Sequence, residues 1–195
     1  WVSVVREYAP DKKVIYDHQK AGTDIPDTGK RYMEIMKTAG VDAVILFPQS
    51  GRSTQWEWTH SAFEQGLEVI VGGEMTHKNY KASEGGYISD EALDKIYVLA
   101  AKAGVNNFVM PGNKPDRIEH YKKIILEAVP GIKPMIYSPG LVTQGGDIAA
   151  GANAAGDMWQ AIVGRGIYGD VKKAGKYFTR QEMHDAALAH ASKLA

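Results

Sequence analysis

The chain contains no cysteine among its 195 residues. Disulfide bonds, thiolate metal sites and cysteine nucleophiles are therefore excluded. There is also no excess of charge, with 23 basic and 23 acidic residues, and no basic face or tail of the kind that binds nucleic acid. No signal-peptide pattern is present, and apolar runs such as residues 43–47 are far too short to span a bilayer. We therefore expect a cytoplasmic protein that binds neither nucleic acid nor membranes.

A metal site is not expected either. The six histidines form no pair with ligand spacing, and the sequence has no His-Glu-x-x-His motif. The three tryptophans at 56, 58 and 159 are expected to be packing residues.

Short apolar segments alternate with longer amphipathic segments along most of the chain. After a first helix over residues 1–8, the predicted strands are 14–16, 42–48, 68–75, 107–110, 134–137 and 160–163. The predicted helices are 28–39, 53–65 with Ser53 as its cap, 90–103, 117–128, 149–155 and 180–194. Alternation of this kind indicates a parallel sheet, and strands without clean alternation indicate burial on both faces.

Six strand–helix units leave two architectures to compare. An open doubly wound sheet would usually carry a glycine-rich turn after its first strand, and no G-x-G-x-x-G sequence is present there. We therefore expect an α/β fold of the (β/α)8 TIM-barrel type. This chain would hold six of the eight units, in a single incomplete barrel domain over residues 1–195.

The loop after the first predicted strand is rich in ionisable residues. Asp17, Lys20 and Asp24 follow the apolar run 14–16, and (β/α)8 enzymes carry their chemistry at the carboxyl ends of strands. A lysine between carboxylates can donate a proton, because its neighbours set its charge and position. The alternative is that these are solvated loop or helix-cap residues.

Two later strand ends carry features of a phosphate site. The stretch Ser-Pro-Gly-Leu-Val-Thr-Gln-Gly-Gly-Asp contains Gln144, a neutral donor suited to a phosphate oxygen, and its glycines allow close approach of a ligand. Gly164 and Arg165 end the next strand, and an arginine there can bind phosphate with two hydrogen bonds. Successive strand ends of this kind favour phosphate binding over a flexible turn and a surface arginine.

The sequence resembles the orotidine 5′-monophosphate decarboxylase family over residues 14–168. The resemblance rests on YDHQKAGTDIPDT, EMTH, GNKPDRI, SPGLVTQGGD and VGRGIY, which occur in the order of the family. It implies a (β/α)8 barrel, a homodimer, no metal or organic cofactor, and decarboxylation of orotidine 5′-monophosphate (OMP) to UMP in pyrimidine biosynthesis.

The resemblance also implies roles for individual residues. Lys20 matches the lysine that protonates C6 of the pyrimidine, and Asp17 matches the aspartate beside the substrate carboxylate. Asp24 matches the acid that reaches the neighbouring subunit's site. The implied substrate contacts are Ile25 and Thr28 beside Asp24, Thr76 near the pyrimidine, and Pro139, Gln144, Gly164 and Arg165 at the pyrimidine edge and the phosphate.

Two departures from the family pattern stand out. The family has Asp-x-Lys-x-x-Asp, whereas this chain has Asp-x-x-Lys-x-x-x-Asp. On a regular strand Asp17 and Lys20 point to opposite faces, so they can meet only if the chain bulges or leaves strand geometry. The alternative is that His18, two residues before Lys20, takes the aspartate position. We prefer Asp17, because a neutral imidazole would not hold a lysine charged. The family's first strand, helix and second strand have no counterpart, and from the start at Trp1 we expect a fragment.

Two other functions remain open from the sequence. One is a magnesium-dependent sugar-phosphate lyase or decarboxylase of the same suprafamily. The other is a module that binds a phosphate ligand without catalysis, which the altered spacing makes plausible.

Overall fold

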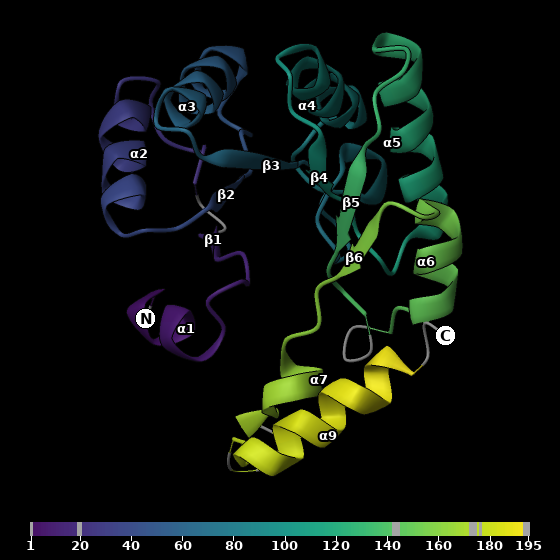
Figure 1. The fold of residues 1–195 in the computed structure, drawn as a ribbon. Coiled ribbons are helices and arrows are strands. Elements are labelled where there is room, and N and C mark those ends of the chain that lie inside the picture. Colours follow the sequence, from purple (N-terminus) through teal and green to yellow (C-terminus); the bar gives the residue numbers. More distant parts are fainter. Residues whose placement is uncertain (1, 19–20, 142–144, 172–174, 176, 193–195) are drawn as a thin grey trace.

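The computed structural model describes residues 2–18, 21–141, 145–171, 175 and 177–192. Its centre is a sheet of six parallel strands in sequential order, shown in Figure 1. The strands are β1 (Ile15–Asp17), β2 (Ala43–Leu46), β3 (Glu68–Gly72), β4 (Asn107–Val109), β5 (Met135–Ser138) and β6 (Trp159–Ala161). Each strand is parallel to the next, with Ile15 opposite Ala43 and Ala43 opposite Glu68.

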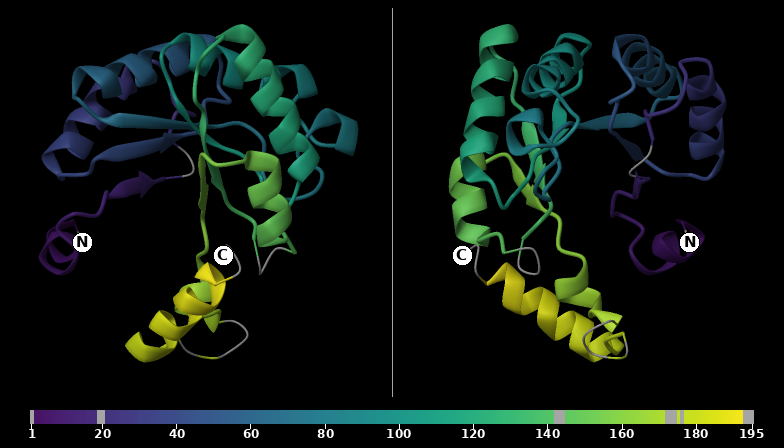
Figure 2. Two further views of the ribbon diagram at one scale, coloured as in Figure 1. Left: turned by 45° about the vertical axis from the view of Figure 1, so that its right-hand side comes forward. Right: turned by 180° about the vertical axis from the view of Figure 1, so that it is seen from behind.

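Helices connect successive strands and cover one side of the curved sheet. The connecting helices are α2 (Thr28–Thr38), α3 (Arg52–Glu64), α4 (Asp90–Lys102), α5 (Pro115–Ala128) and α6 (Ile148–Ala155). Helix α1 (Val2–Tyr8) precedes β1, and α7 (Arg165–Tyr168) and α9 (Arg180–Ala191) follow β6. A 3-10 turn, η1 (Ala82–Glu84), precedes α4. Figure 2 shows α2 to α6 as an arc outside the strands, with α1 and α9 at its two ends. This is the (β/α)8 arrangement with six units, as predicted.

Side-chain caps mark the starts of helices α4 and α6. Ser89 accepts a hydrogen bond from the N–H of Ala92 and caps α4, and Asp147 caps α6 in the same way. The predicted cap at Ser53 is wrong. Helix α3 begins one residue earlier, at Arg52, and its N-cap is Gly51, which has no side chain to offer.

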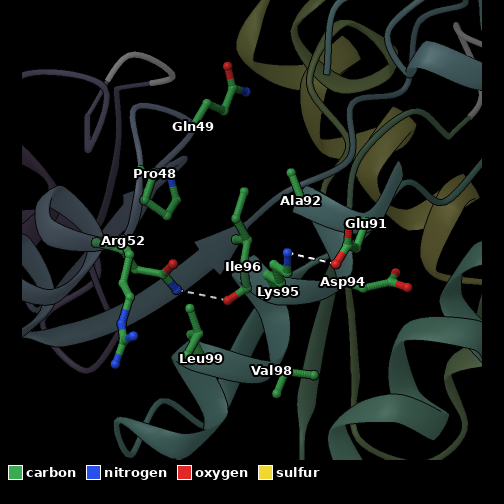
Figure 3. Close-up of a pocket in the computed structure, with 12 residues that line it drawn as sticks. Pro48, Gln49, Arg52, Glu91, Ala92, Asp94, Lys95, Ile96, Val98 and Leu99 are labelled. Carbon is green, nitrogen blue, oxygen red and sulfur yellow. Dashed lines mark hydrogen bonds and ion pairs between the residues drawn. The ribbon is translucent and has the colours of Figure 1, made fainter. Parts of the chain in front are cut away.

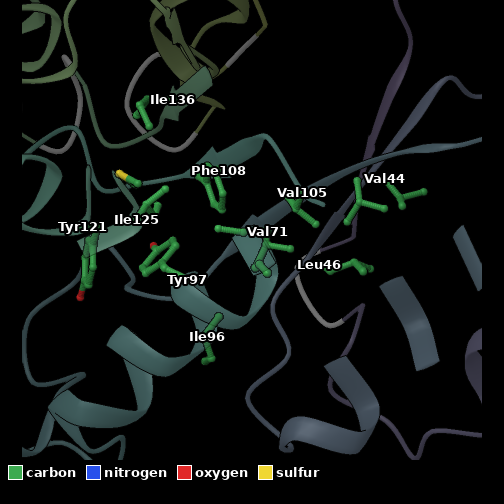
Figure 4. Close-up of a cluster of buried hydrophobic side chains, with 14 of the residues drawn as sticks. Val44, Leu46, Val71, Ile96, Tyr97, Val105, Phe108, Tyr121, Ile125 and Ile136 are labelled. Atoms are coloured by element: carbon green, nitrogen blue, oxygen red, sulfur yellow. The ribbon is translucent and has the colours of Figure 1, made fainter. Parts of the chain in front are cut away.

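The core has two layers because side chains alternate along each strand. Val44 and Leu46 of β2 face the helices, where they join the large cluster of Figure 4 with Val71, Tyr97 and Phe108. The opposite face of the sheet carries a smaller cluster. It consists of Ala43, Ile45, Phe47, Ile70 and Val109. That second cluster lies where the inside of a closed barrel would be.

The sheet has two edges, since β1 pairs only with β2 and β6 pairs only with β5. All six strands run the same way, so their carboxyl ends meet on one side of the sheet. The loops that carry the predicted site residues leave from that side.

Candidate active site

A cavity of about 80 Å³ lies at the carboxyl ends of the strands. Its lining consists of Asp17, Ile45, Phe47, Glu74, Met75, Thr76, Val109, Pro139 and Ile162. Three residues predicted from the sequence, Asp17, Thr76 and Pro139, are thus brought to one place from the ends of β1, β3 and β5. Polar groups that converge on an apolar cavity at the carboxyl ends of the strands are typical of (β/α)8 enzyme sites.

Asp17 is the last residue of β1 and the one ionisable group of its loop that lines the cavity, as far as the described residues go. Partial burial raises the pKa of its carboxyl, and His18 offsets part of that effect. His18 does not line the cavity. Its ring stacks on that of Tyr16, with ring centroids 6.1 Å apart. Residues 16 and 18 therefore share one side of the chain and Asp17 takes the other. Lys20 lies outside the described residues.

The loop before α2 is fixed to α3 by hydrogen bonds to its backbone. Thr54 Oγ1 donates to the Asp24 carbonyl at 2.9 Å, and Trp58 Nε1 donates to the Ile25 carbonyl at 3.1 Å. Thr28 Oγ1 also donates to the Ile25 carbonyl, at 2.8 Å. Asp24 and Ile25 are exposed, and Asp24, Ile25 and Thr28 are not among the residues that line the 80 Å³ cavity.

Thr76 contacts Gly140, near the start of the loop that follows β5. A Cβ built on Gly140 would come 2.6 Å from Thr76 Cγ2, and Gly140 has a φ of +89°, so both space and backbone favour glycine there. The N–H of Gly146 donates to the Gly140 carbonyl at 3.2 Å and closes the loop. Asn113 Nδ2 donates to the Thr76 carbonyl at 3.0 Å. Gln144, within this loop, lies outside the described residues.

Gly164 and Arg165 begin α7, a single helical turn at a place where a strand-end turn was predicted. The Arg165 guanidinium is 3.6 Å from Asp170 Oδ2, and 43% of its side chain is exposed. Neither residue lines the 80 Å³ cavity. The structure therefore does not bring Arg165 into contact with Asp17 or Thr76.

Sequence reasoning missed the most buried charge at this end of the sheet. The Glu74 side chain is fully buried, and it contacts Lys81, Lys114, Arg117 and Tyr121. Its neighbours hold it ionised. Burial alone would raise the pKa of Glu74, but hydrogen bonds from Lys114, Tyr121 and Arg117 lower it below the usual value. The available signal was an acid and two bases in EMTH and GNKPDRI, which follow neighbouring strands.

A second hollow, of about 580 Å³, lies between α3 and α4 and is drawn in Figure 3. Gln55 Nε2 donates to the Ile96 carbonyl at 2.8 Å, and Lys95 pairs with Glu91 at 2.7 Å. None of the predicted site residues lines it. This hollow is therefore separate from the 80 Å³ cavity.

Two findings concern only the part of the chain that the structure describes. No group of three or more His, Cys, Asp or Glu side chains there is arranged to hold a metal ion. None of the helices there is long and apolar enough to cross a membrane.

Comparison with known proteins gives a consistent result. Residues 5–177 match the model of the orotidine 5'-phosphate decarboxylase / HUMPS family. Orotidine 5'-phosphate decarboxylase of Methanosarcina barkeri is 36% identical over 167 residues, which is 86% of this chain and 69% of that protein. The enzyme of Methanosarcina mazei is 35% identical, over 86% of this chain and 70% of that protein.

Solved structures show the same likeness. Orotidine 5'-monophosphate decarboxylase of Methanocaldococcus jannaschii, in complex with the inhibitor BMP, superimposes with a TM-score of 0.76 at 24% identity. The superposition covers 98% of this chain and 79% of that one. Orotidine 5'-phosphate decarboxylase of Pyrococcus horikoshii gives a TM-score of 0.70 at 26% identity, over 98% of this chain and 78% of that one.

Proposed function

The chain belongs to the orotidine 5'-phosphate decarboxylase / HUMPS family, and from this premise we propose that it decarboxylates OMP to UMP in pyrimidine biosynthesis. The observation that carries the proposal is the 36% identity to a decarboxylase over 86% of the chain. The cavity that gathers Asp17, Thr76 and Pro139 at the strand ends supports it. A cytoplasmic location and the absence of any metal or organic cofactor are parts of the same proposal.

The proposed mechanism separates binding from chemistry. Gln144, Gly164 and Arg165 bind the phosphate, and this remote binding energy holds the pyrimidine carboxylate against Asp17. The bond between C6 and the carboxylate breaks, carbon dioxide leaves, and the electron pair stays on C6. The ammonium of Lys20 stabilises that carbanion and then donates its proton to C6. Thr76 and Pro139 contact the pyrimidine edge.

We also propose a homodimer in which Asp24, Ile25 and Thr28 reach the neighbouring site. Asp24 and Ile25 are exposed, with 59% of Ile25 accessible. The hydrogen bonds from Thr54 and Trp58 fix their backbone. A fixed, exposed loop with an apolar tip is suited to contact a second subunit.

The test uses the ultraviolet spectrum of OMP incubated with the purified chain. We expect the spectrum to change to that of UMP, with and without EDTA. Lys20→Ala should lower turnover by more than about 10³-fold while UMP binding stays measurable, because the proton donor and its charge are lost. Lys123→Ala, on the exposed face of α5, is the control and should turn over normally.

Two results would contradict the proposal. Normal turnover in Lys20→Ala would remove the proposed role of this lysine. An unchanged OMP spectrum, together with sugar-phosphate cleavage that EDTA abolishes, would favour the magnesium-dependent lyase instead. Binding of phosphate ligands without any turnover would favour the non-catalytic module.

A further inference from the structure

The feature that the proposed mechanism does not use is the buried charge at Glu74. Its two carboxylate oxygens accept hydrogen bonds from Lys114, Arg117 and Tyr121 and form an ion pair with Lys81. Oε1 lies 2.8 Å from Lys114 Nζ and 3.5 Å from Lys81 Nζ. Oε2 lies 2.5 Å from the Tyr121 hydroxyl and 2.9 Å from Arg117 Nε. We call Glu74, Lys81, Lys114, Arg117 and Tyr121 the Glu74 cluster.

Two further acids, Glu84 and Asp90, surround the bases of the Glu74 cluster. Lys81 lies 3.4 Å from Glu84 and 3.8 Å from Asp90, and Lys114 lies 3.5 Å from Glu84. Three acids thus face three bases, and the charges balance. Taking this many ions out of water generally costs as much as their mutual attraction returns. Stability alone is therefore a weak explanation for the cluster, and its position becomes the informative feature.

The Glu74 cluster encloses the segment that carries Thr76. Glu74 stands two residues before Thr76 and lines the same cavity. From the other side, Lys114 is adjacent to Asn113, whose Nδ2 donates to the Thr76 carbonyl at 3.0 Å. The hydroxyl of Tyr97 also accepts from the backbone N–H of Glu74 at 3.2 Å. The backbone entering Thr76 is therefore held at Glu74, and the backbone leaving it is held through Asn113.

The part of the proposed phosphate site at Gly164 and Arg165 has no such link. No hydrogen bond or ion pair between described residues joins the Glu74 cluster to Gly164 or Arg165. Arg165 pairs with Asp170 instead. A disturbance at Glu74 should therefore reach the base-binding end of the site and not Gly164 or Arg165.

We infer that the Glu74 cluster positions Thr76 against the pyrimidine ring, so that Glu74 and Tyr121 control recognition of the base and not of the phosphate. This inference rests on the proposed function, in which Thr76 contacts the pyrimidine. Glu74 and Tyr121 act through Thr76 and are positioning residues.

The main test compares two tyrosines that each lose only a hydroxyl. Tyr121→Phe removes the 2.5 Å hydrogen bond to Glu74. Tyr32→Phe is the matched control, since its buried hydroxyl has no hydrogen-bond partner among the described residues. Calorimetry measures binding of UMP, which has the base, and of ribose 5-phosphate, which lacks it. We expect Tyr121→Phe to weaken UMP binding about 10-fold, to leave ribose 5-phosphate within about 2-fold, and Tyr32→Phe to change neither.

A second pair of variants changes the acid itself. Glu74→Gln removes the buried charge, whereas Glu68→Gln removes an acid from the other end of β3, where it pairs with Lys13 at 2.6 Å in a half-exposed position. Glu74→Gln should lower UMP binding more than ribose 5-phosphate binding, and Glu68→Gln should affect neither. Equal losses for both ligands in Tyr121→Phe or Glu74→Gln would mean that the cluster only supports the fold, and would overturn the inference.

A measurement without ligand keeps this inference separable from the proposed function. The methyl resonance of Thr76, assigned in threonine-labelled protein, should shift in Tyr121→Phe and stay in place in Tyr32→Phe. An unmoved Thr76 resonance would overturn the positioning role even if OMP is turned over. If the unmodified chain binds neither ligand, the proposed function fails, and the Thr76 resonance alone still decides the positioning role.

Discussion

The surroundings of three carboxylates near the sheet displace their pKa values, upward for Asp17 and downward for Asp42 and Glu74. Partial burial raises the pKa of Asp17. The N–H of Val14 and the guanidinium of Arg6 lower the pKa of Asp42, and the bases and the tyrosine around Glu74 lower its pKa. Asp17 is thus the carboxylate that the fold holds at a disadvantage when it is charged. Ionisable groups with displaced pKa values are common at functional sites.

The raised pKa of Asp17 gives a stability prediction. Between the ordinary pKa of 3.8 and the higher folded value, the folded state binds more protons, so stability falls as the pH rises through that interval. Asp17→Asn removes this loss. We expect its Tm to exceed that of the unmodified chain by about 1–2 °C at neutral pH, and to match it near about pH 3.5. The gain is small because Asp17 is an exposed residue, so water screens its charge.

The control for this prediction is Asp42→Asn. Folding lowers the pKa of Asp42, which is the opposite shift to that of Asp17. The charged Asp42 therefore stabilises the folded chain above its ordinary pKa, and this stabilisation is lost as the pH falls through its pKa in the folded state. Asp42→Asn should therefore lower Tm at neutral pH. Thermal unfolding followed by circular dichroism measures both variants. A Tm for Asp17→Asn below that of the unmodified chain at neutral pH would contradict the prediction.

Motif reasoning found some of the residues that line the 80 Å³ cavity and missed Glu74, for a physical reason. Asp17, Thr76 and Pro139 lie at or shortly after the ends of strands, and parallel strands must bring their carboxyl ends together. The role of Glu74 depends on which cations surround it, and Lys114 and Arg117 are about 40 positions away in the sequence. An acid after a strand has the same local pattern whether it is solvated or fully buried.

Among helix contacts, the one between α2 and α3 is closest to the Asp24 loop. Gly29 of α2 packs against Trp58 of α3, and a Cβ there would lie 2.8 Å from Trp58 Cδ1 and 3.2 Å from Trp58 Cα. Trp58 in turn donates to the Ile25 carbonyl. The distance between the two helices therefore sets where the Asp24 loop lies.

We predict opposite signs for two glycine-to-alanine changes in helices. Alanine is preferred over glycine within a helix by about 0.5–1 kcal/mol. At Gly29 the overlap with Trp58 costs about 1–3 kcal/mol, so Gly29→Ala should destabilise the chain. At Gly151 of α6 the nearest atoms lie 3.5 Å from the Cβ position, an ordinary contact, so Gly151→Ala should stabilise by about 0.5 kcal/mol. Urea unfolding measures both, and stabilisation by Gly29→Ala would contradict the packing argument.

Helices and strands were predictable where local signals are strong. Gly40 and Gly66 end helices with φ of +79° and +67°, and the apolar run of β2 is buried throughout. Short helical turns were not predictable, since α7 and η1 span four and three residues and contain too few positions for a helical period. Helix α5 begins two residues before its predicted start, because Pro115 fits the first turn.

Over the whole molecule, burial declines from the middle of the sheet to its edges. Every residue of β2 and all but the first of β3 are buried, whereas no residue of β1 or β6 is. Helices α1, α7 and α9 contain no buried residue. The sequential strand order follows from the alternation of strands and helices. The strand sequences reveal part of this gradient, because β1 contains Asp17 and β6 contains Gln160 whereas β2 is wholly apolar. They do not reveal that β1 and β6 each pair on one side only.

This gradient predicts the order of amide hydrogen exchange. Amides of β2 and β3 should exchange slowest, and those of β1, β6 and α7 fastest, because local opening there exposes little buried surface.

Asp17 and Arg165 both lie in these weakly protected elements, so a ligand that binds them should act mainly there. At a UMP concentration of about 100 times Kd, exchange in β1 and α7 should slow by up to about 100-fold. Exchange in α1, which carries no proposed contact, should stay unchanged and serves as the internal control. Mass spectrometry of peptic fragments gives all of these rates in one experiment. Uniform slowing across the chain, or slowing confined to β2 and β3, would contradict binding of UMP at Asp17 and Arg165.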